Sequence, residues 1–185
     1  MSPRPRPTVV FSILALVALG GLAAVWATRG DAPKPPRAQL PTKLVGVYLP
    51  TWGDVALHDL PDTYNLIFAA FAVGDGNGGG RVSYSPDRSQ DAASLRTDIA
   101  AAQSAGRTVL ISVGGAENNN LHVTTPQQVD ELVTSVSALV DQYGFDGMDW
   151  DIEDTSRWNA ESALAASRAL IRRYGSRFVI ATAPS

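Results

Sequence analysis

The chain has 185 residues, enough for one domain with a sizeable core, and its formal net charge is only −3. No basic stripe is present, which argues against a nucleic-acid-binding protein. The absence of cysteine excludes disulfides, a thiol nucleophile and a cysteine-bound metal. The only histidines are His58 and His122, which we expect in surface loops, so neither a metal nor a cofactor is predicted.

The N-terminus is predicted to be separate from the fold. Arg4 and Arg6 precede an uncharged apolar run over residues 9–27, a pattern typical of a secretory signal peptide or a membrane anchor. Residues 1–27 therefore predict export. Cleavage after Ala27 is favoured, and anchoring to the outer face of the cell membrane is the alternative. The proline-containing residues 28–42 predict an extended linker.

The remainder, residues 43–185, alternates short apolar runs with helical patterns, which predicts an α/β fold with parallel strands and right-handed crossovers. The glycine-rich residues 75–80 lack the strand-to-helix context of a phosphate loop, so we interpret them as a structural turn. Strands are predicted over residues 43–49, 64–73, 107–113, 146–153 and 177–183, and helices over residues 89–105, 126–143 and 160–174.

Capping signals and apolar spacing define the predicted helices. Thr125, Pro126 and Gln128 form a helix start with a capping box, and Gly144 fits the left-handed position after the helix end. Asn159 is predicted to cap the last helix, which Gly175 would close. The residues expected on buried helix faces are Leu95, Ile99, Ala102, Val129, Leu132, Val133, Val136, Leu139, Val140, Tyr143, Leu164, Leu170, Ile171 and Tyr174.

The most informative stretch is residues 146–153, which reads Asp-Gly-Met-Asp-Trp-Asp-Ile-Glu. Because strand side chains alternate, Asp149, Asp151 and Glu153 share one face while Met148 and Trp150 point to the other. Acids in a row repel one another and lose solvation, so folding alone would not favour them. We interpret the row as a site for chemistry on a substrate.

The position of these acids separates two fold classes. A doubly wound open sheet and a (β/α)8 barrel both fit the alternation, but the barrel is preferred because its chemistry lies at the carboxyl ends of the strands. Five strands are counted before Ser185, whereas a complete barrel needs about 250 residues. The expected fold is therefore an α/β (β/α)8 TIM barrel that is truncated after strand five.

The motifs resemble those of glycoside hydrolase family 18, the chitinases and related endo-β-N-acetylglucosaminidases. Residues 146–153 fit the family signature Asp-Gly-x-Asp-x-Asp-x-Glu, and residues 112–115 match its Ser-x-Gly-Gly motif. Tyr48, Trp52, Phe71 and the Ala-Pro pair at 183–184 also lie where family members place similar residues. The resemblance covers residues 43–185 and identifies them as the N-terminal portion of a catalytic barrel.

The resemblance implies a retaining glycosidase in which the substrate's own N-acetyl group takes part. Glu153 would be the general acid and then the base, and Asp151 would orient the N-acetyl group. Asp149 would hold Asp151 through a shared proton, and Ser112 would hydrogen-bond this inner pair. Trp150 is assigned to the core between barrel and helices, and Asp146 to a structural turn. The substrate-binding candidates are Tyr48, Trp52, Phe71, Ser112, Gly114 and Gly115.

The resemblance is incomplete in ways that leave alternatives open. Thr182 stands where family members usually carry Met, and the family's Tyr on strand six and Trp on strand eight would lie beyond Ser185. The implied partner is a glycan that contains N-acetylglucosamine, such as chitin, chitooligosaccharides, peptidoglycan-like glycans or N-linked glycan cores. The alternatives are a non-catalytic glycan-binding relative, which the intact Glu153 argues against, and an inactive truncated remnant.

Overall fold

The computed structural model describes residues 40–50, 52–86, 91–116 and 120–182. The predicted signal peptide or anchor lies outside these ranges, as does most of the predicted linker. No helix within the described ranges is long and apolar enough to cross a membrane. The strands are β1 (Gly46–Pro50), β2 (Leu66–Gly74), β3 (Val82–Ser83), β4 (Thr108–Gly114), β5 (Gly147–Asp151) and β6 (Val179–Thr182). The α-helices are α1 (Ala92–Ser104), α2 (Pro126–Tyr143) and α3 (Ala160–Tyr174), and two 3-10 turns are η1 (Leu57–Asp59) and η2 (Thr155–Arg157).

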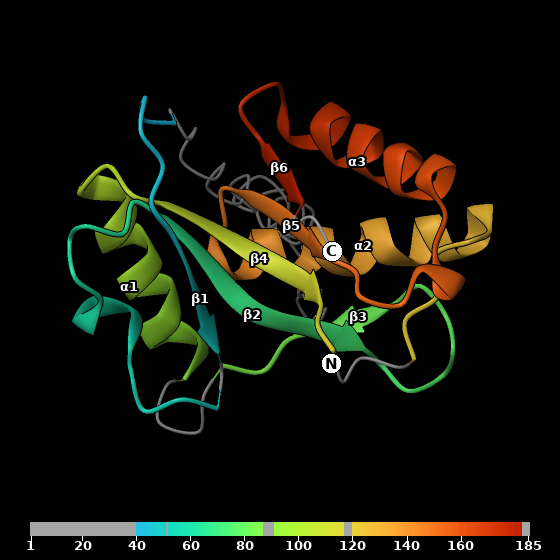
Figure 1. Cartoon of the computed structure of the whole chain (residues 1–185), viewed down its shortest axis with the longest axis horizontal. Coiled ribbons are helices and arrows are strands. Elements are labelled where there is room, and N and C mark those ends of the chain that lie inside the picture. Colours follow the sequence, from blue (N-terminus) through green and yellow to red (C-terminus); the bar gives the residue numbers. More distant parts are fainter. Residues whose placement is uncertain (1–39, 51, 87–90, 117–119, 183–185) are drawn as a thin grey trace, which may run out of the picture. The chain divides into compact units, whose positions relative to one another are not determined.

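The sheet is parallel and follows the chain in the order β1-β2-β4-β5-β6, as Figure 1 shows. Sequential parallel strands with crossovers of one hand place their helices on the same face. The chain therefore has the predicted strand–helix repeat, with α1, α2 and α3 covering one side. Residue 112 of β4 is paired with residue 149 of β5, which brings the two sequence motifs side by side.

Strand β3 was not predicted. It pairs antiparallel with the end of β2, where Val73 is opposite Ser83 and Gly74 is opposite Val82. The glycine-rich residues 75–80 form the turn of this hairpin, in agreement with their structural interpretation. The Gly80 N–H donates to Glu131 Oε2 of α2 at 2.9 Å, which fastens the turn to the helix layer. Two residues carry too little periodicity for a sequence pattern to reveal such a strand.

Helix α2 begins and ends where its capping signals predict. The Gln128 N–H donates to Thr125 Oγ1 at 3.3 Å, and the Thr125 N–H donates to Gln128 Oε1 at 3.1 Å. Gly144 closes the helix with a φ of 85°. All of the predicted inward positions are buried except Val133, which is partly buried and packs against the core. In α1 the cap is Asp91, so this helix starts later than expected.

The predicted inner face of α3 is wrong at two positions. Leu164 is 48% exposed and Ile171 is 38% exposed, whereas Leu170 is buried as expected. The helix turns smaller residues, Ala163, Ala166 and Ser167, toward the sheet. The reason is Trp150 of β5, which fills the space beneath the helix and donates its indole N–H to Ser167 Oγ at 3.0 Å. This contact confirms the assignment of Trp150 to the core between strands and helices.

Candidate active site

Strand β5 and the residues after it carry the row of acids. Asp149 is 1% exposed, Asp151 is partly buried and Glu153 is exposed, so burial decreases along the row. Met148 and Trp150 on the opposite face are buried in the core. The strand ends at Asp151, two residues earlier than expected, so Glu153 lies on the segment that leaves the sheet. The row therefore runs from the protein interior to the surface.

Two hydroxyl groups hold Asp149. Ser112 Oγ donates to Asp149 Oδ2 at 2.8 Å, and the Tyr48 hydroxyl donates to the same oxygen at 3.0 Å. Burial raises the pKa of Asp149, although both hydrogen bonds oppose that shift. Burial also raises the pKa of Tyr48, and the negative charge of Asp149 adds to it. The structure thus places Tyr48, a predicted substrate-binding residue, in contact with the innermost acid.

Asp151 lies between Asp149 and Glu153 in an environment unfavourable to charge. Burial raises its pKa, and the charges of Asp149 and Glu153 raise it further. Among the hydrogen bonds of the described residues, none joins Asp151 to Asp149, so the shared proton stays a prediction. Thr182 of β6, which stands in place of the family's Met, is paired with Trp150 of β5.

The two glycines after the Ser112 motif have a structural reason that the sequence did not suggest. A Cβ on Gly114, whose φ is 125°, would overlap the main-chain carbonyl oxygen of Asp151. A Cβ on Gly115 would press on the ring of Phe71 at 3.0 Å. The Gly115 N–H donates to the Asp151 carbonyl at 2.8 Å, so β4 and β5 approach closely here. The fold itself therefore requires glycine at both of these predicted substrate-binding positions.

Aromatic side chains line one side of the acid row. Phe71 has its ring centroid 6.0 Å from Tyr48 and 5.9 Å from Trp52, and the Ala70–Phe71 peptide bond is cis. Trp52 is 71% exposed. Phe68, which the sequence interpretation missed, stacks on Tyr48 at 4.6 Å. We refer to the hollow on this side as the aromatic hollow; its lining residues are Trp52, Phe71, Val73, Gly114, Gly115, Ala116 and Glu153.

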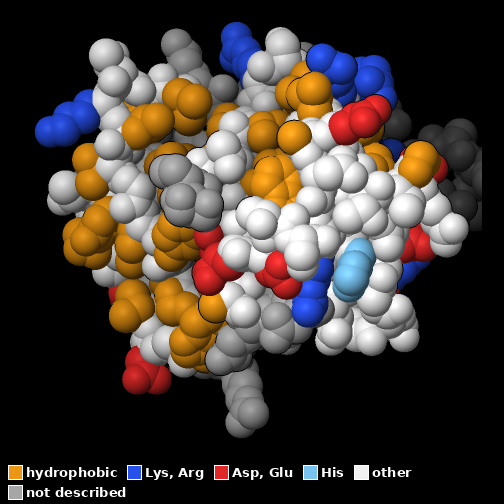
Figure 2. Space-filling view, turned by 45° about the vertical axis from the view of Figure 1, so that its right-hand side comes forward, with side chains coloured by type: hydrophobic (Ala, Val, Ile, Leu, Met, Phe, Trp, Pro, Cys, Tyr) orange, Lys and Arg blue, Asp and Glu red, His pale blue; other side chains and the backbone are white. Residues whose placement is uncertain are grey.

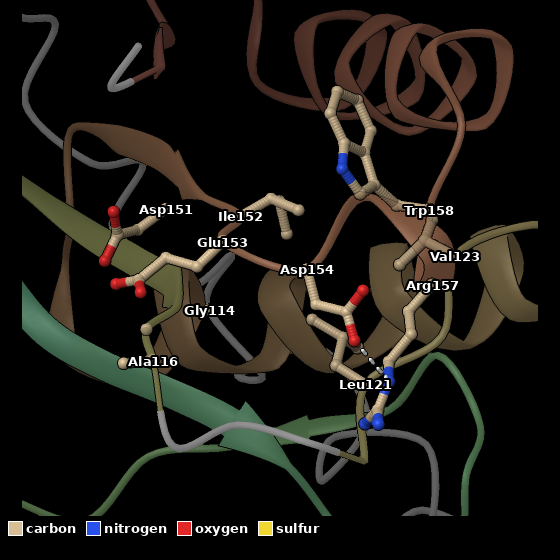
Figure 3. A pocket seen from close by; sticks show the side chains of 11 residues that line it. Gly114, Ala116, Leu121, Val123, Asp151, Ile152, Glu153, Asp154, Arg157 and Trp158 are labelled. Carbon is tan, nitrogen blue, oxygen red and sulfur yellow. Dashed lines mark ion pairs between the residues drawn. The ribbon is translucent and has the colours of Figure 1, made fainter. Parts of the chain in front are cut away.

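A second hollow, which we call the β5 hollow, lies on the other side of Glu153. Figure 3 shows the carboxyl groups of Asp151 and Glu153 directed to one side and Trp158 standing on the other. At its rim, Arg157 Nε lies 2.9 Å from Asp154 Oδ2. No sequence signal singled out Asp154, Arg157 or Trp158, since they follow the motif in an irregular segment. The hollow is also lined by Gly114, Gly115, Ala116, Leu121, Val123 and Ile152.

The remaining titratable candidates lie outside the site. Asp146 is buried at the other end of β5, where its Oδ2 accepts the Val109 N–H at 2.9 Å. Burial raises the pKa of Asp146 to about 6. His58 is on the surface, as expected, with Nδ1 2.9 Å from Asp98 Oδ2, and His122 is partly exposed. Within the described ranges, no group of three or more His, Cys, Asp or Glu side chains is arranged to hold a metal ion.

The surface around the acids is divided in character. Figure 2 shows acidic side chains near the middle of one face, between a largely hydrophobic area and a mostly polar one. A sugar presents both C–H faces and hydroxyl groups, so a surface with both characters beside carboxyl groups suits a glycan. The arrangement provides an exposed carboxyl group for proton transfer and a deeper, partly buried one beside it for holding a polar group.

Comparisons with known proteins show the family of the chain. The sequence model described as Glycosyl hydrolases family 18 matches residues 44–184. Exochitinase 1 of Streptomyces olivaceoviridis is 31% identical over 179 residues, covering 84% of this chain and 29% of that protein. Chitinase Chi52 of Paenibacillus xylanexedens is 27% identical, covering 71% of this chain and 27% of that protein. The chain thus spans less than a third of the length of either relative.

A solved structure gives the same answer for the fold. The family 18 chitinase of Chromobacterium violaceum superposes with a TM-score of 0.67 and 28% identity, covering 77% of this chain and 40% of that one. This similarity, together with the family match, confirms the predicted (β/α)8 barrel class and the resemblance to the family. The protein belongs to glycosyl hydrolase family 18.

Proposed function

We propose that the protein hydrolyses β-1,4-linked N-acetylglucosamine polymers, namely chitin and chitooligosaccharides, by a retaining, substrate-assisted mechanism. The observation that carries the proposal is the graded row of acids. Asp149 is buried and held by two hydroxyls, Asp151 is partly buried, and Glu153 is exposed at the edge of the sheet. Such a gradient allows neighbouring carboxyl groups to take different protonation states, as acid and base roles require.

In the proposed first step, Glu153 protonates the glycosidic oxygen and the bond to the leaving sugar breaks. The acetamido carbonyl oxygen of the retained sugar attacks its anomeric carbon, which gives an oxazolinium ion. Asp151 accepts the acetamido N–H, orients this group and stabilises the positive charge. The raised pKa of Asp151 suits a group that exchanges a proton with a neighbour during this step.

In the proposed second step, Glu153, now a carboxylate, removes a proton from the incoming water. The water oxygen bonds to the anomeric carbon and the oxazolinium ring opens, so the product keeps its anomeric configuration and Glu153 regains its proton. Asp149 supports Asp151 throughout, and Ser112 and Tyr48 hold Asp149. Trp52 and Phe71 are proposed to stack on sugar faces in the aromatic hollow.

The proposed substrate and location follow from the same resemblance. Relatives are named exochitinase and chitinase, which favours chitin over the other glycans that carry N-acetyl groups. An enzyme that degrades an insoluble extracellular polymer must act outside the cytoplasm. The charge-free run over residues 9–27 is therefore proposed to direct secretion, or to anchor the chain on the outer face of the membrane.

The direct test is Glu153→Gln in the full chain, with chitooligosaccharides as substrates and products separated by chromatography. Loss of the proton donor should lower kcat by at least about 10²-fold, because general acid catalysis contributes about 10²- to 10⁴-fold. Oligosaccharide binding, measured by calorimetry, should persist, because glutamine retains the size and polarity of the side chain.

The outcomes separate the proposal from its alternatives. A wild-type chain that binds oligosaccharides without cleaving them would support the non-catalytic glycan-binding alternative. Normal hydrolysis by the Glu153→Gln variant would show that another group is the acid. Asp130→Asn, on the exposed side of α2, is the matched control and should leave kcat unchanged.

A further inference from the structure

The side chain of Glu153 has no hydrogen-bond partner among the described residues, although its proposed role demands an accurate position. It lies two residues beyond the end of β5, so the sheet does not hold it directly. A misplacement of about 1 Å can lower an enzymatic rate about 10²-fold. The main chain on either side of Glu153 must therefore be fixed by other contacts.

Before Glu153, the main chain is held by β4. The Gly115 N–H donates to the Asp151 carbonyl at 2.8 Å, which is the last contact of β5 with the neighbouring strand. After Glu153, the next residue begins a compact turn. Asp154 Oδ1 accepts the Ser156 N–H at 3.0 Å and the Ser156 hydroxyl at 2.6 Å. Its other oxygen, Oδ2, lies 2.9 Å from Arg157 Nε.

Arg157 connects this turn to the segment after β4. The Val123 N–H donates to the Arg157 carbonyl at 2.8 Å, and the Asn159 N–H donates to the Val123 carbonyl at 3.3 Å. Val123 and Trp158 form an isolated parallel bridge. Arg157 thus holds Asp154 with its side chain and the segment after β4 with its main chain.

We infer that Asp154 is a positioning residue for Glu153. Together with Arg157 it forms a clamp that joins the segment bearing Glu153 to the segment after β4, with the β5 hollow between them. Figure 3 shows this arrangement, with Asp154 directed to Arg157 and Glu153 directed the opposite way, toward Asp151. The inference rests on the proposed role of Glu153 as the general acid.

The side of the Glu153 segment that faces the β5 hollow explains why a clamp is needed. Ile152 and Trp158 pack against the core but also line the β5 hollow, which reaches as far as Glu153, so the segment borders open space on that side. A carboxylate that accepts several hydrogen bonds at the start of a turn is a short and rigid connection. Loss of the clamp should let Glu153 move while leaving Trp52 and Phe71 of the aromatic hollow, and therefore most of the glycan binding, in place.

The test compares Asp154→Ala and Asp154→Asn with a matched control, Asp91→Ala, in the full chain. Asparagine is also a good capping residue and keeps the hydrogen bonds to Ser156, but its amide nitrogen cannot accept from Arg157, so that half of the clamp is lost. Asp91 caps α1 in the same way, with its Oδ1 2.7 Å from Ser94 N, but it is not part of the site. Kinetics on chitooligosaccharides would give kcat and KM, and thermal unfolding would give the folded fraction at the assay temperature.

We expect Asp154→Ala to lower kcat about tenfold or more, with KM changed by less than about twofold. Asp154→Asn, which loses only the Arg157 half of the clamp, should fall between Asp154→Ala and the wild type, and Asp91→Ala should stay within about threefold of the wild-type kcat. The inference is overturned if Asp154→Ala loses no more kcat than Asp91→Ala, or if Asp154→Asn keeps the full wild-type kcat. A rise in KM at unchanged kcat would also contradict it, because it would indicate a binding residue.

Two further variants keep the test decisive. If Asp154→Ala is unfolded at the assay temperature, Arg157→Ala opens the same clamp from its other side, and an unchanged kcat there overturns the inference. Glu153→Gln separates this test from that of the proposed function. If the wild-type chain is active and Glu153→Gln is not, an unaffected Asp154→Ala refutes only the clamp. If Glu153→Gln is fully active, the proposed function itself fails.

Discussion

Two buried aspartates, Asp146 just before β5 and Asp149 within it, differ in the groups that they bind. Asp146 is 4% exposed and Asp149 is 1% exposed, so burial does not distinguish them. Asp146 accepts the main-chain N–H of Val109, whereas Asp149 accepts the side-chain hydroxyls of Ser112 and Tyr48. Burial raises the pKa of both carboxyl groups. The hydrogen-bond partner therefore indicates which aspartate serves the fold and which serves the site.

The comparison explains why an acid row can persist in a folded protein. An aspartate that satisfies a main-chain N–H contributes to the fold because that donor would otherwise be buried without a partner. Asp149 and its two hydroxyl donors could together be replaced by apolar groups of similar shape at little cost, so their presence in the core points to function. The following predictions test this division from the largest expected effect to the smallest.

The largest effect is expected from Asp149→Asn. Removal of the charge that supports Asp151 should lower kcat on chitooligosaccharides by about 10²-fold, the scale of one acid–base contribution. The free energy of unfolding should change little, because asparagine can still accept hydrogen bonds and avoids burying a charge. Steady-state kinetics and thermal unfolding of the same preparation measure both quantities. A variant that keeps its rate and loses stability would reverse the assigned roles of the two aspartates.

Asp146→Ala should lower stability by about 1 to 3 kcal/mol, because it leaves the Val109 N–H without its partner. The kcat per folded molecule should be unchanged. Asp146→Asn keeps the acceptor and should be at least as stable as wild type at neutral pH. Denaturant unfolding at pH 7 distinguishes the two variants, and equal losses in both would show that the charge, not the hydrogen bond, is what matters.

The difference in stability between Asp146→Asn and the wild type should depend on pH. Burial raises the pKa of Asp146 in the folded state to about 6, above its usual value of 3.8. The folded protein holds this proton more tightly than the unfolded chain, so its stabilising effect is complete below about pH 4. That effect is lost as the pH rises through about 6. The Tm of Asp146→Asn relative to wild type should therefore rise from pH 4 to pH 7 and then level off.

The smallest effects are expected from the hydroxyl donors. Tyr48→Phe and Ser112→Ala each remove one hydrogen bond to Asp149 Oδ2, worth about 1 kcal/mol, and should lower kcat by about three- to tenfold. Because both bonds reach the same oxygen, the double variant should not show the product of the two losses. Kinetics of the four proteins form a double-mutant cycle. Strict additivity would indicate that Tyr48 acts elsewhere, for example on the sugar.

The sequence by itself determined the strand–helix order, the caps of α2 and the row of acids. These features depend on local patterns: residue alternation in β5, the capping box at Thr125 and the glycine after Tyr143. The resemblance of residues 112–115 and 146–153 to family motifs also predicted the barrel class, and the comparisons confirmed that fold class. Such features depend on residues that are close together in the chain, so a single sequence is enough to identify them.

Only the tertiary structure decided which surfaces meet. The hydrogen bond from Tyr48 to Asp149 joins residues 101 positions apart, and no sequence pattern predicted that they would pair. The rotation of α3, which exposes Leu164 and Ile171, follows from the volume of Trp150 on another element. The clamp at Asp154 needs Val123 from the segment after β4. Contacts of this kind depend on packing between distant elements, which residue periodicity does not encode.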